Sequence, residues 1–186
     1  MLILDGKIIN CSKDENSKFG FVVTATQDGV TKTCWISKKG NGENYCRVYC
    51  GNSYEAKQGE VSFYYLHKIV FASAMGWDRL DIAPNYHVHH LNHSGEIKEN
   101  PAAYNDITNL IYLPRSEHQK LHSYERKVRE LSASLEFKTP EERQLTWIEM
   151  NKYEHAIDQI ERKYIAIRNN RIKKLENEAK MLDNLD

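Results

Sequence analysis

The chain has 186 residues, of which 40% are hydrophobic and 28% are charged, a composition typical of one or two small globular domains. Its 26 basic and 26 acidic residues cancel, so bulk charge predicts no polyanionic partner and any nucleic-acid contact must depend on local charge. No apolar run approaches the ~20 residues that span a bilayer, and the first residues lack the pattern of a secretory signal. Four cysteines are too few for a disulfide scaffold. We therefore expect a reduced, cytoplasmic protein that does not bind a membrane.

Residues 1–64 are predicted to form a region of β-strands. The runs Phe19–Thr26 and Val30–Ser37 are rich in β-branched and aromatic residues, and Asp28-Gly29 between them is typical of a hairpin turn. Tyr45–Tyr49 predicts another short strand. This region is faintly similar to the opening strands of a cold-shock or OB-type barrel, in which exposed Phe19, Phe21 and Trp35 would stack on bases. Aromatic residues of a small sheet more often belong to the core, so the similarity only allows a DNA-contacting role.

Residues 65–126 form the second predicted region. Tyr64–Met75 predicts a helix that ends at Gly76, and the loop-rich stretch after it holds six of the eight histidines. His118 and His122 are four residues apart, so on a helix both side chains project from one face and can share a divalent ion.

His89 and His90 are adjacent and lie on opposite sides of an extended backbone. One can therefore bind the metal while the other faces a substrate. An imidazole with an ordinary pKa of ~6.5 can accept a proton from water at neutral pH, and a metal ion can stabilise charge on a phosphate oxygen.

This set of residues resembles the HNH endonucleases, in which a β-hairpin and a following helix hold a metal ion. The resemblance implies that His89 is the first metal ligand, His90 the general base, Asn109 the central asparagine and His118 the ligand on the helix. His122 matches the additional ligand of the colicin-nuclease type. The amide of Asn109 can also bridge backbone groups and hold the loop that carries the His pair.

The resemblance extends upstream of the histidines. Tyr45–Tyr49, Gly59–Val61 and Leu66–Val70 are similar to the strand, turn and helix that precede the motif in phage-associated members. The similarity covers Tyr45 to His122, less than half of the chain. One departure is a longer connection, Glu96 to Asp106, where many relatives have a compact turn.

The resemblance implies a metal-dependent DNA endonuclease of a bacterial or phage-infected cell that hydrolyses phosphodiester bonds. Mg²⁺, Mn²⁺, Ni²⁺ and Zn²⁺ all remain candidates for the ion. Two alternatives stay open: a nuclease that acts on RNA or structured DNA, and a zinc-stabilised DNA-binding protein without turnover. His90 favours the enzyme, because a purely structural site needs no base beside its ligand.

Several other polar residues have two interpretations. Arg115 precedes the metal-binding helix and is either a phosphate contact or a solvated loop residue. His87 and His93 match no motif position and are interpreted as exposed or substrate-side residues, His67 as a packed residue and His155 as a surface residue. Cys11, Cys34, Cys46 and Cys50 are either a structural zinc site or free thiols, and their spacing favours thiols.

Residues 127–186 are predicted to form a long helical extension, so that the whole chain is of the α+β class. Thr139-Pro140-Glu141-Glu142 suits a helix start. An apolar seam follows at Tyr153, Ile157, Ile160, Tyr164 and Ile167. Such a seam must pack either on its own domain or on a second copy of the chain in a homodimer. The window from Arg162 to Lys174 contains six basic residues and no acidic residue. In this window Arg168, Arg171 and Lys174 are candidate nucleic-acid contacts, or else part of a solvated face.

Overall fold

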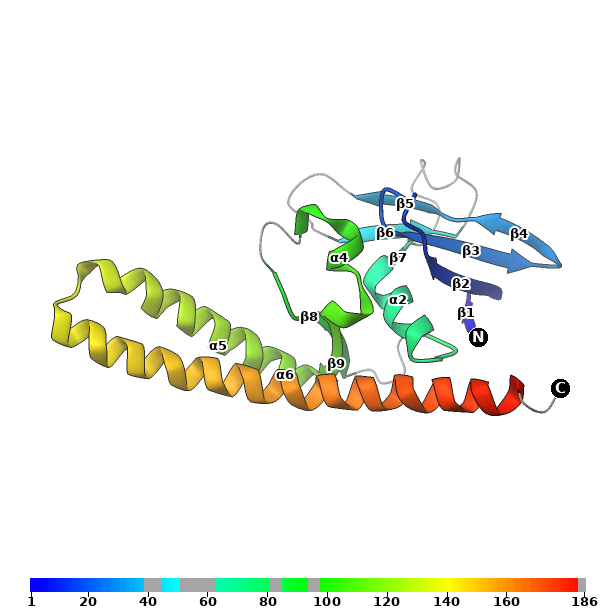
Figure 1. Cartoon of the computed structure of the whole chain (residues 1–186). Helices are drawn as coiled ribbons and strands as arrows, with labels where there is room; N and C mark the ends of the chain where they lie inside the picture. Colours follow the sequence, from blue (N-terminus) through cyan, green and yellow to red (C-terminus); the bar gives the residue numbers. More distant parts are fainter. Residues whose placement is uncertain (39–44, 51–62, 81–84, 94–97, 184–186) are drawn as a thin grey trace.

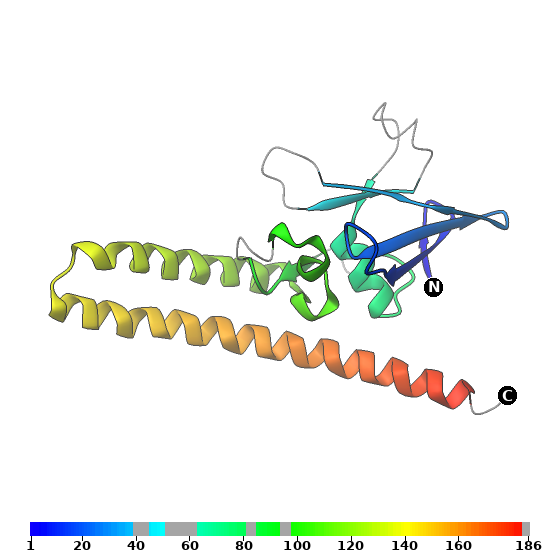
Figure 2. The ribbon, with the colours of Figure 1, turned by 45° about the horizontal axis from the view of Figure 1, so that its top comes forward.

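The computed structural model describes residues 1–38, 45–50, 63–80, 85–93 and 98–183. It has an α+β architecture, as predicted: the N-terminal part is rich in strands, and the C-terminal part is helical (Figure 1). Two long helices form an antiparallel hairpin that extends away from the strands. The second of them returns along the β-rich part, as a second view also shows (Figure 2).

The first sheet is antiparallel with the order β1-β2-β3-β4. Its strands are β1 (Leu2–Leu4), β2 (Lys7–Lys13), β3 (Phe21–Gln27) and β4 (Val30–Thr33). The predicted hairpin turn is confirmed, since Asp28 and Gly29 both adopt positive φ, +51° and +76°, as a two-residue hairpin loop requires. Gly20 has φ +73°, and a Cβ there would lie 2.2 Å from the Ala102 Cβ, so glycine permits the close approach of α4 (Pro101–Tyr104).

The second sheet has the order β5-β6-β7, with β5 (Trp35–Lys38), β6 (Cys46–Tyr49) and β7 (Phe63–Tyr65). The single strand predicted over Val30–Ser37 is wrong in one respect. It divides at Cys34, whose backbone N–H donates to the Val23 carbonyl at 2.8 Å, and β5 joins the second sheet.

Helix α2 (Leu66–Ala74) packs between the sheets and begins two residues later than predicted. The reason is that Tyr64 and Tyr65 are paired in β7. The helix is followed by Gly76 at φ +66°, as the sequence predicts. Its buried residues, with the inward side chains of both sheets, form the larger hydrophobic core: Leu66, Ile69, Val70 and Phe71 with Ile9, Val23, Ile36 and Val48.

The third sheet is the antiparallel pair β8 (Tyr86–His90) and β9 (Leu110–Pro114), in which His89 lies opposite Ile111. The long connection between them contains α4 and the short 3₁₀ helix η1 (Ile107–Asn109). β9 passes without an intervening residue into α5 (Arg115–Ser134), which runs through residue 126 unbroken.

After η2 (Leu135–Phe137), α6 (Pro140–Asp183) begins at a capping box. The Thr139 Oγ1 accepts from the Glu142 N–H at 3.3 Å, and the Glu142 carboxylate accepts from the Thr139 N–H at 2.9 Å. Ile160 and Tyr164 pack against Leu121 of α5 and inward residues of β9, so this part of the seam is buried within one chain.

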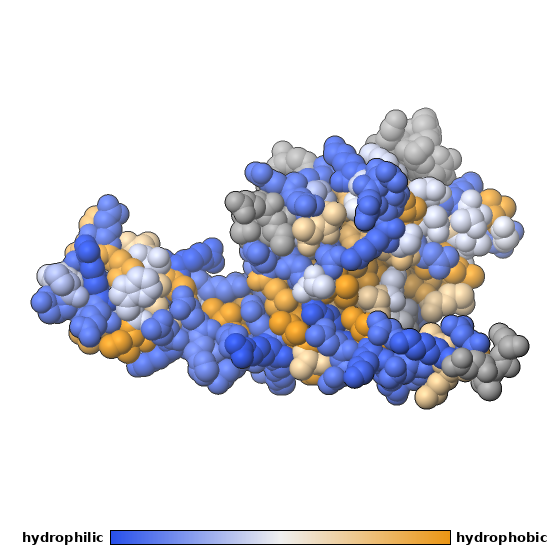
Figure 3. All heavy atoms as spheres, in the orientation of Figure 1, coloured by the Kyte–Doolittle hydropathy of each residue, from blue (hydrophilic) through white to orange (hydrophobic). Residues whose placement is uncertain are grey.

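The far end of the helical hairpin keeps an apolar surface, visible as orange atoms in Figure 3. Leu145, Trp147 and Ile148 are about half exposed or more. Among the described residues, no helix combines the length and the apolar character that crossing a bilayer needs.

Arg168 corrects two predictions. The seam was expected to continue at Ile167, but Ile167 is 52% exposed and Arg168 takes the buried position at 6%. Its Nη1 donates to the carbonyl oxygens of η1 and β9 at 2.8–2.9 Å; these belong to Ile107, Thr108 and Leu110. A guanidinium engaged in this way braces the fold and is not free to bind DNA.

We expect Arg168→Met to lower the free energy of unfolding by about 2–4 kcal/mol, because it leaves buried carbonyl groups without a donor. Urea unfolding followed by circular dichroism measures the change. Lys174→Met is the control, since Lys174 is exposed and its ion pair, with Glu178 at 3.7 Å, is on the surface. Equal stability of the two variants would contradict the bracing role.

Candidate metal centre

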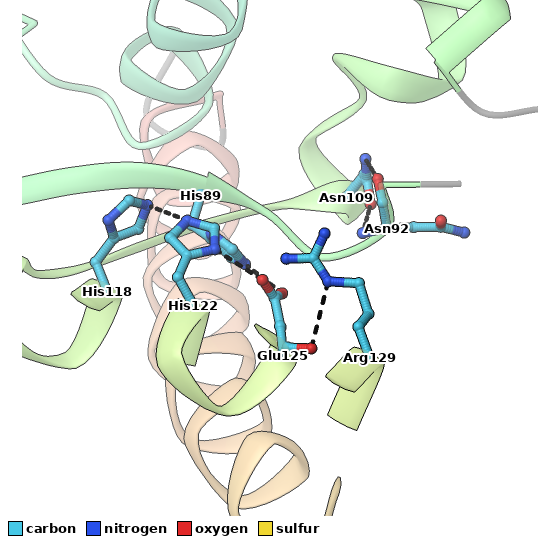
Figure 4. Close-up of polar contacts among 7 residues, drawn as sticks. All are labelled: His89, Asn92, Asn109, His118, His122, Glu125 and Arg129. Carbon is cyan, nitrogen blue, oxygen red and sulfur yellow. Dashed lines mark hydrogen bonds and ion pairs between the residues drawn. The ribbon is translucent and has the colours of Figure 1, made fainter. Parts of the chain in front are cut away.

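Three of the predicted ligands come together in the structure. His89 on β8 and His118 and His122 on α5 place their nearest nitrogen atoms within 4.8 Å of one another (Figure 4). Because α5 starts where β9 ends, its first turns lie beside the face of β8 that carries His89. Residues far apart in sequence are thus brought to one point by the hairpin and the helix.

The spacing of the two helix histidines suits a shared ion. The His118 and His122 Nε2 atoms are 3.1 Å apart. Two nitrogens that bind a tetrahedral zinc ion at their usual bond length lie about 3.4 Å apart. The side chain of His89 is 1% exposed and that of His122 is 44% exposed, so the cluster is open to solvent on the His122 side.

Glu125 belongs to the same cluster and was not predicted. Its Oε2 lies 2.7 Å from the His122 Nδ1, a pairing that leaves Nε2 of His122 free for a metal. Burial opposes its charge, but the hydrogen bond from His122 and the nearby His93 and Arg129 hold its pKa below the ordinary value. Its position three residues after His122, on the same face of α5, is the signal that could have identified it.

His93 corrects another prediction. It was interpreted as an exposed or substrate-side residue, but its ligand atom lies within 4.8 Å of those of His89 and Glu125. The Nε2 atoms of His89 and His93 are buried and have no hydrogen-bond partner among the residues that the structure describes. Unpartnered nitrogens aimed at one point fit a bound cation. His87 is not part of either group of candidate ligands, and its ring stacks on that of His118 with 5.2 Å between the ring centroids.

The buried imidazoles are in the form that binds metals. Burial, followed by repulsion from neighbouring imidazoles, lowers the pKa of His89 to about 2 and that of His118 to about 4. Both side chains are therefore neutral at pH 7, which leaves a lone pair available to a cation.

His90 points to the other side of β8, as the alternation of an extended strand predicts. Its ring is stacked on Tyr104, with 3.9 Å between centroids and 5° between planes, and the residue is 2% exposed. Burial, followed by the neighbouring imidazoles of His67, His93 and His89, lowers its pKa to about 2. The His90 Nε2 has no hydrogen-bond partner among the described residues. The ring lies 6.1 Å from that of His93, measured between centroids, so His90 remains close to the cluster.

Asn109 braces the two ends of the connection between β8 and β9. Its Oδ1 accepts from the Asn92 N–H at 2.8 Å, and its Nδ2 donates to the Tyr104 carbonyl at 3.0 Å. The Leu91 N–H donates to the Asn109 carbonyl at 2.9 Å. These bonds hold the segment that follows His89 and His90.

The cationic candidates have different environments. Arg115 is exposed at the first residue of α5. Arg171 donates from Nε to the Met75 carbonyl at 3.3 Å, and Lys174 pairs with Glu178, so the predicted basic window is partly used within the fold.

Arg129 was not predicted as part of the site. It lies on the same face of α5 as Glu125, one turn farther along, and its Nε donates back to the Glu125 carbonyl at 3.4 Å. Figure 4 shows its guanidinium turned toward the cluster. No acidic side chain of the described residues pairs with it, in contrast to Arg126, which pairs with Glu130.

The cysteines do not form a comparable centre. All four are free thiols, and no three of them in the described part of the chain bring their sulfur atoms within 4.8 Å of one another. Cys34 and Cys50 lie across the end of the β5–β6 pair, where Cys34 together with burial raises the pKa of the Cys50 thiol. The neighbours that the sequence suggested, Cys46 and Cys50, are not the pair that interacts.

Comparison of the chain with protein-family models, with curated proteins and with solved structures finds no match. Inference about function therefore depends on the chemistry of the site.

We expect His118→Ala to weaken the affinity for Zn²⁺ and Ni²⁺ at least about tenfold, because a direct ligand is lost. Glu125→Gln should weaken it by about 10–100-fold through poorer orientation of His122. Calorimetric titration at pH 7 measures both. His87→Ala, which removes a ring in contact with His118 but no ligand, serves as the control. Unchanged affinity in His118→Ala would place the ion elsewhere.

Proposed function

We propose that this protein is a metal-dependent endonuclease of the HNH type that hydrolyses phosphodiester bonds in DNA. The observation that carries the proposal is the convergence of His89, His118 and His122 from an antiparallel strand pair and the helix that follows it. A further histidine, His90, projects from the opposite side of the same strand, and Asn109 braces the loop between the strands. Ligand, base and brace are the roles that the sequence resemblance implies for these residues, and their placement supports the proposal.

The ligand set favours a transition metal. Imidazole nitrogens suit Zn²⁺ and Ni²⁺ better than Mn²⁺ or Mg²⁺, which prefer oxygen ligands, and Mg²⁺ also retains its waters. Among the described residues, the carboxylate that groups with the histidines is that of Glu125, and it is already paired with His122. When bound, the ion would stabilise negative charge on the phosphate and on the leaving oxygen.

The protein's own groups have separate roles in this proposal. His90 accepts the proton of the attacking water through Nε2, since burial keeps the imidazole neutral. The negative charge of a phosphate in the site raises the pKa of His90 and so strengthens it as a base. Arg129, whose guanidinium is turned toward the metal cluster and whose charge lowers the pKa of Glu125, can donate to a phosphate oxygen. Asn109 positions His90 through the backbone.

The same site is compatible with two other functions. A nuclease of the same chemistry that prefers RNA or structured DNA would use the same residues. A zinc-stabilised DNA-binding protein without turnover would need the ligands but not His90. The unpartnered Nε2 of His90 favours an enzyme, because a buried polar atom without a partner destabilises a fold that gains nothing else from it.

Incubation of supercoiled plasmid with the protein and Mn²⁺, Ni²⁺, Zn²⁺ or Mg²⁺ in turn tests the proposal. We expect nicked or linear product with at least one transition metal. His90→Gln should lower the cleavage rate on the order of 10²-fold or more, as loss of a general base does, while metal affinity stays unchanged. His155→Gln, a change on the exposed surface of α6, is the control.

Gel electrophoresis resolves the products and shows whether one strand or both are cut. Absence of cleavage by the wild-type protein with every ion would refute the endonuclease. Near-normal cleavage by folded His90→Gln would refute the role of His90.

A further inference from the structure

The second sheet presents a row of aromatic rings on the face that points away from the core. Trp35, Tyr49 and Phe63 lie opposite one another on β5, β6 and β7, while Ile36 and Val48, one residue along, face inward. The ring centroids of Trp35 and Tyr49 are 5.1 Å apart and stacked, and those of Tyr49 and Phe63 are 6.0 Å apart. Tyr65 and Tyr45 extend the row. We call these five residues the aromatic face.

These rings are accessible. Trp35 is 45% exposed and Phe63 and Tyr45 are each 37% exposed. The exposed large groups are flat rings, with no aliphatic side chain among the outward residues of the three strands. Flat π-faces of this kind are what unpaired bases stack on, whichever base is present.

The charge on this sheet is of one sign. The three strands contain no acidic residue, and the Arg47 guanidinium lies over the Phe63 ring at 4.2 Å from its centroid. Lys38 falls on the other side of β5, with Ile36, and donates to the Lys98 carbonyl. A cavity of about 540 Å³ at the β7 edge is lined by Phe63 and Tyr65 together with Lys68 and Arg79. Rings beside cations complement a ligand that carries both bases and phosphates.

The aromatic face is continuous with the candidate site. Tyr45 contacts Tyr65 of the face at 5.6 Å between centroids and, on its other side, contacts His90 at the same distance. His67 joins the two, with centroids 5.0 Å from Tyr45 and 4.9 Å from His90. The aromatic face therefore adjoins the His90 side of β8 through side chains that are themselves buried at His67 and His90.

We propose that the aromatic face binds an unpaired stretch of nucleic acid by base stacking and delivers it to the metal centre. The delivery to the centre rests on the proposed nuclease function, whereas the binding itself does not. The occupant is a single-stranded segment, because bases in a duplex are already stacked on one another and cannot lie on the rings.

Binding is measured in metal-free buffer, so that no hydrolysis occurs, by fluorescence anisotropy of a labelled oligothymidine of about ten nucleotides. We expect the wild-type protein to bind this strand more tightly than a blunt duplex of equal length at the same salt concentration. Trp35→Leu should weaken binding about tenfold, because it keeps an apolar side chain but removes the ring. Trp35→Phe should retain most of the affinity.

Trp147→Leu is the matched control, since Trp147 is 52% exposed on α6 at the far end of the helical hairpin. If Trp35→Leu fails to fold by circular dichroism, Phe63→Leu replaces it, at the edge strand of the same sheet. Equal affinity of Trp35→Leu and Trp147→Leu, or no binding of the oligothymidine by the wild-type protein, would overturn the proposal.

Two further outcomes separate this proposal from others. A protein that binds the unpaired strand but never cleaves plasmid supports the aromatic face and refutes the nuclease, whereas cleavage without binding of the oligothymidine refutes the face alone.

Sedimentation equilibrium tests whether a second copy of the chain covers the aromatic face. A dimer that dissociates in Trp35→Leu would assign the aromatic face to self-association and overturn the proposal.

Discussion

The candidate metal centre depends on the direct passage of β9 into α5. Pro114 ends the strand and Arg115 begins the helix, and the Arg115 N–H donates to the Asn85 carbonyl at 2.6 Å just before β8. The connection has no spare residue that could let the helix rotate. The face of α5 that carries His118 and His122 is therefore held toward His89, and the ligand spacing follows from backbone geometry as well as from side-chain packing.

Helix α6 stabilises this arrangement by packing against α5 and β9. Ile160 and Tyr164 bury the apolar side of α5 and β9, and Arg168 caps the carbonyl groups where η1 passes into β9. A buried guanidinium is costly unless it forms hydrogen bonds, and here Nη1 donates to the three carbonyls and Nε donates to the Asn169 side chain. The long helix thus serves mainly as a scaffold for β8, β9 and α5, although Arg162 and Lys173 remain exposed on its surface.

Local rules predicted the features that depend on neighbouring residues. The Asp28-Gly29 turn, the helix start at Thr139 and the shared face of His118 and His122 follow from backbone and helix geometry. Glu125 obeys the same helical spacing and was within reach of that reasoning. The approach of His93 to His89 and Glu125 was not, because it depends on how residues 91–93 leave β8.

Features set by tertiary contacts were beyond local patterns. The division of a strand at Cys34 depends on which sheet each half joins, and the burial of Arg168 depends on carbonyl groups some sixty residues earlier in the chain. Of the three aromatic residues that the barrel similarity offered as stacking platforms, Phe21 is 4% exposed in the core while Trp35 lies on the outer face. Alternation along a strand shows which residues share a face, but only the packing of α2 decides which face is buried.

The central claim is that β8 and α5 hold one divalent ion between them. Crystals soaked with Zn²⁺ or Mn²⁺ and measured at the absorption edge of the metal give its position directly in an anomalous difference map. The account predicts a single strong peak at bonding distance, about 2.0–2.3 Å, from nitrogen atoms of His89, His118 and His122. A map with no peak at these histidines, or with its strongest peak at the cysteines, would contradict it.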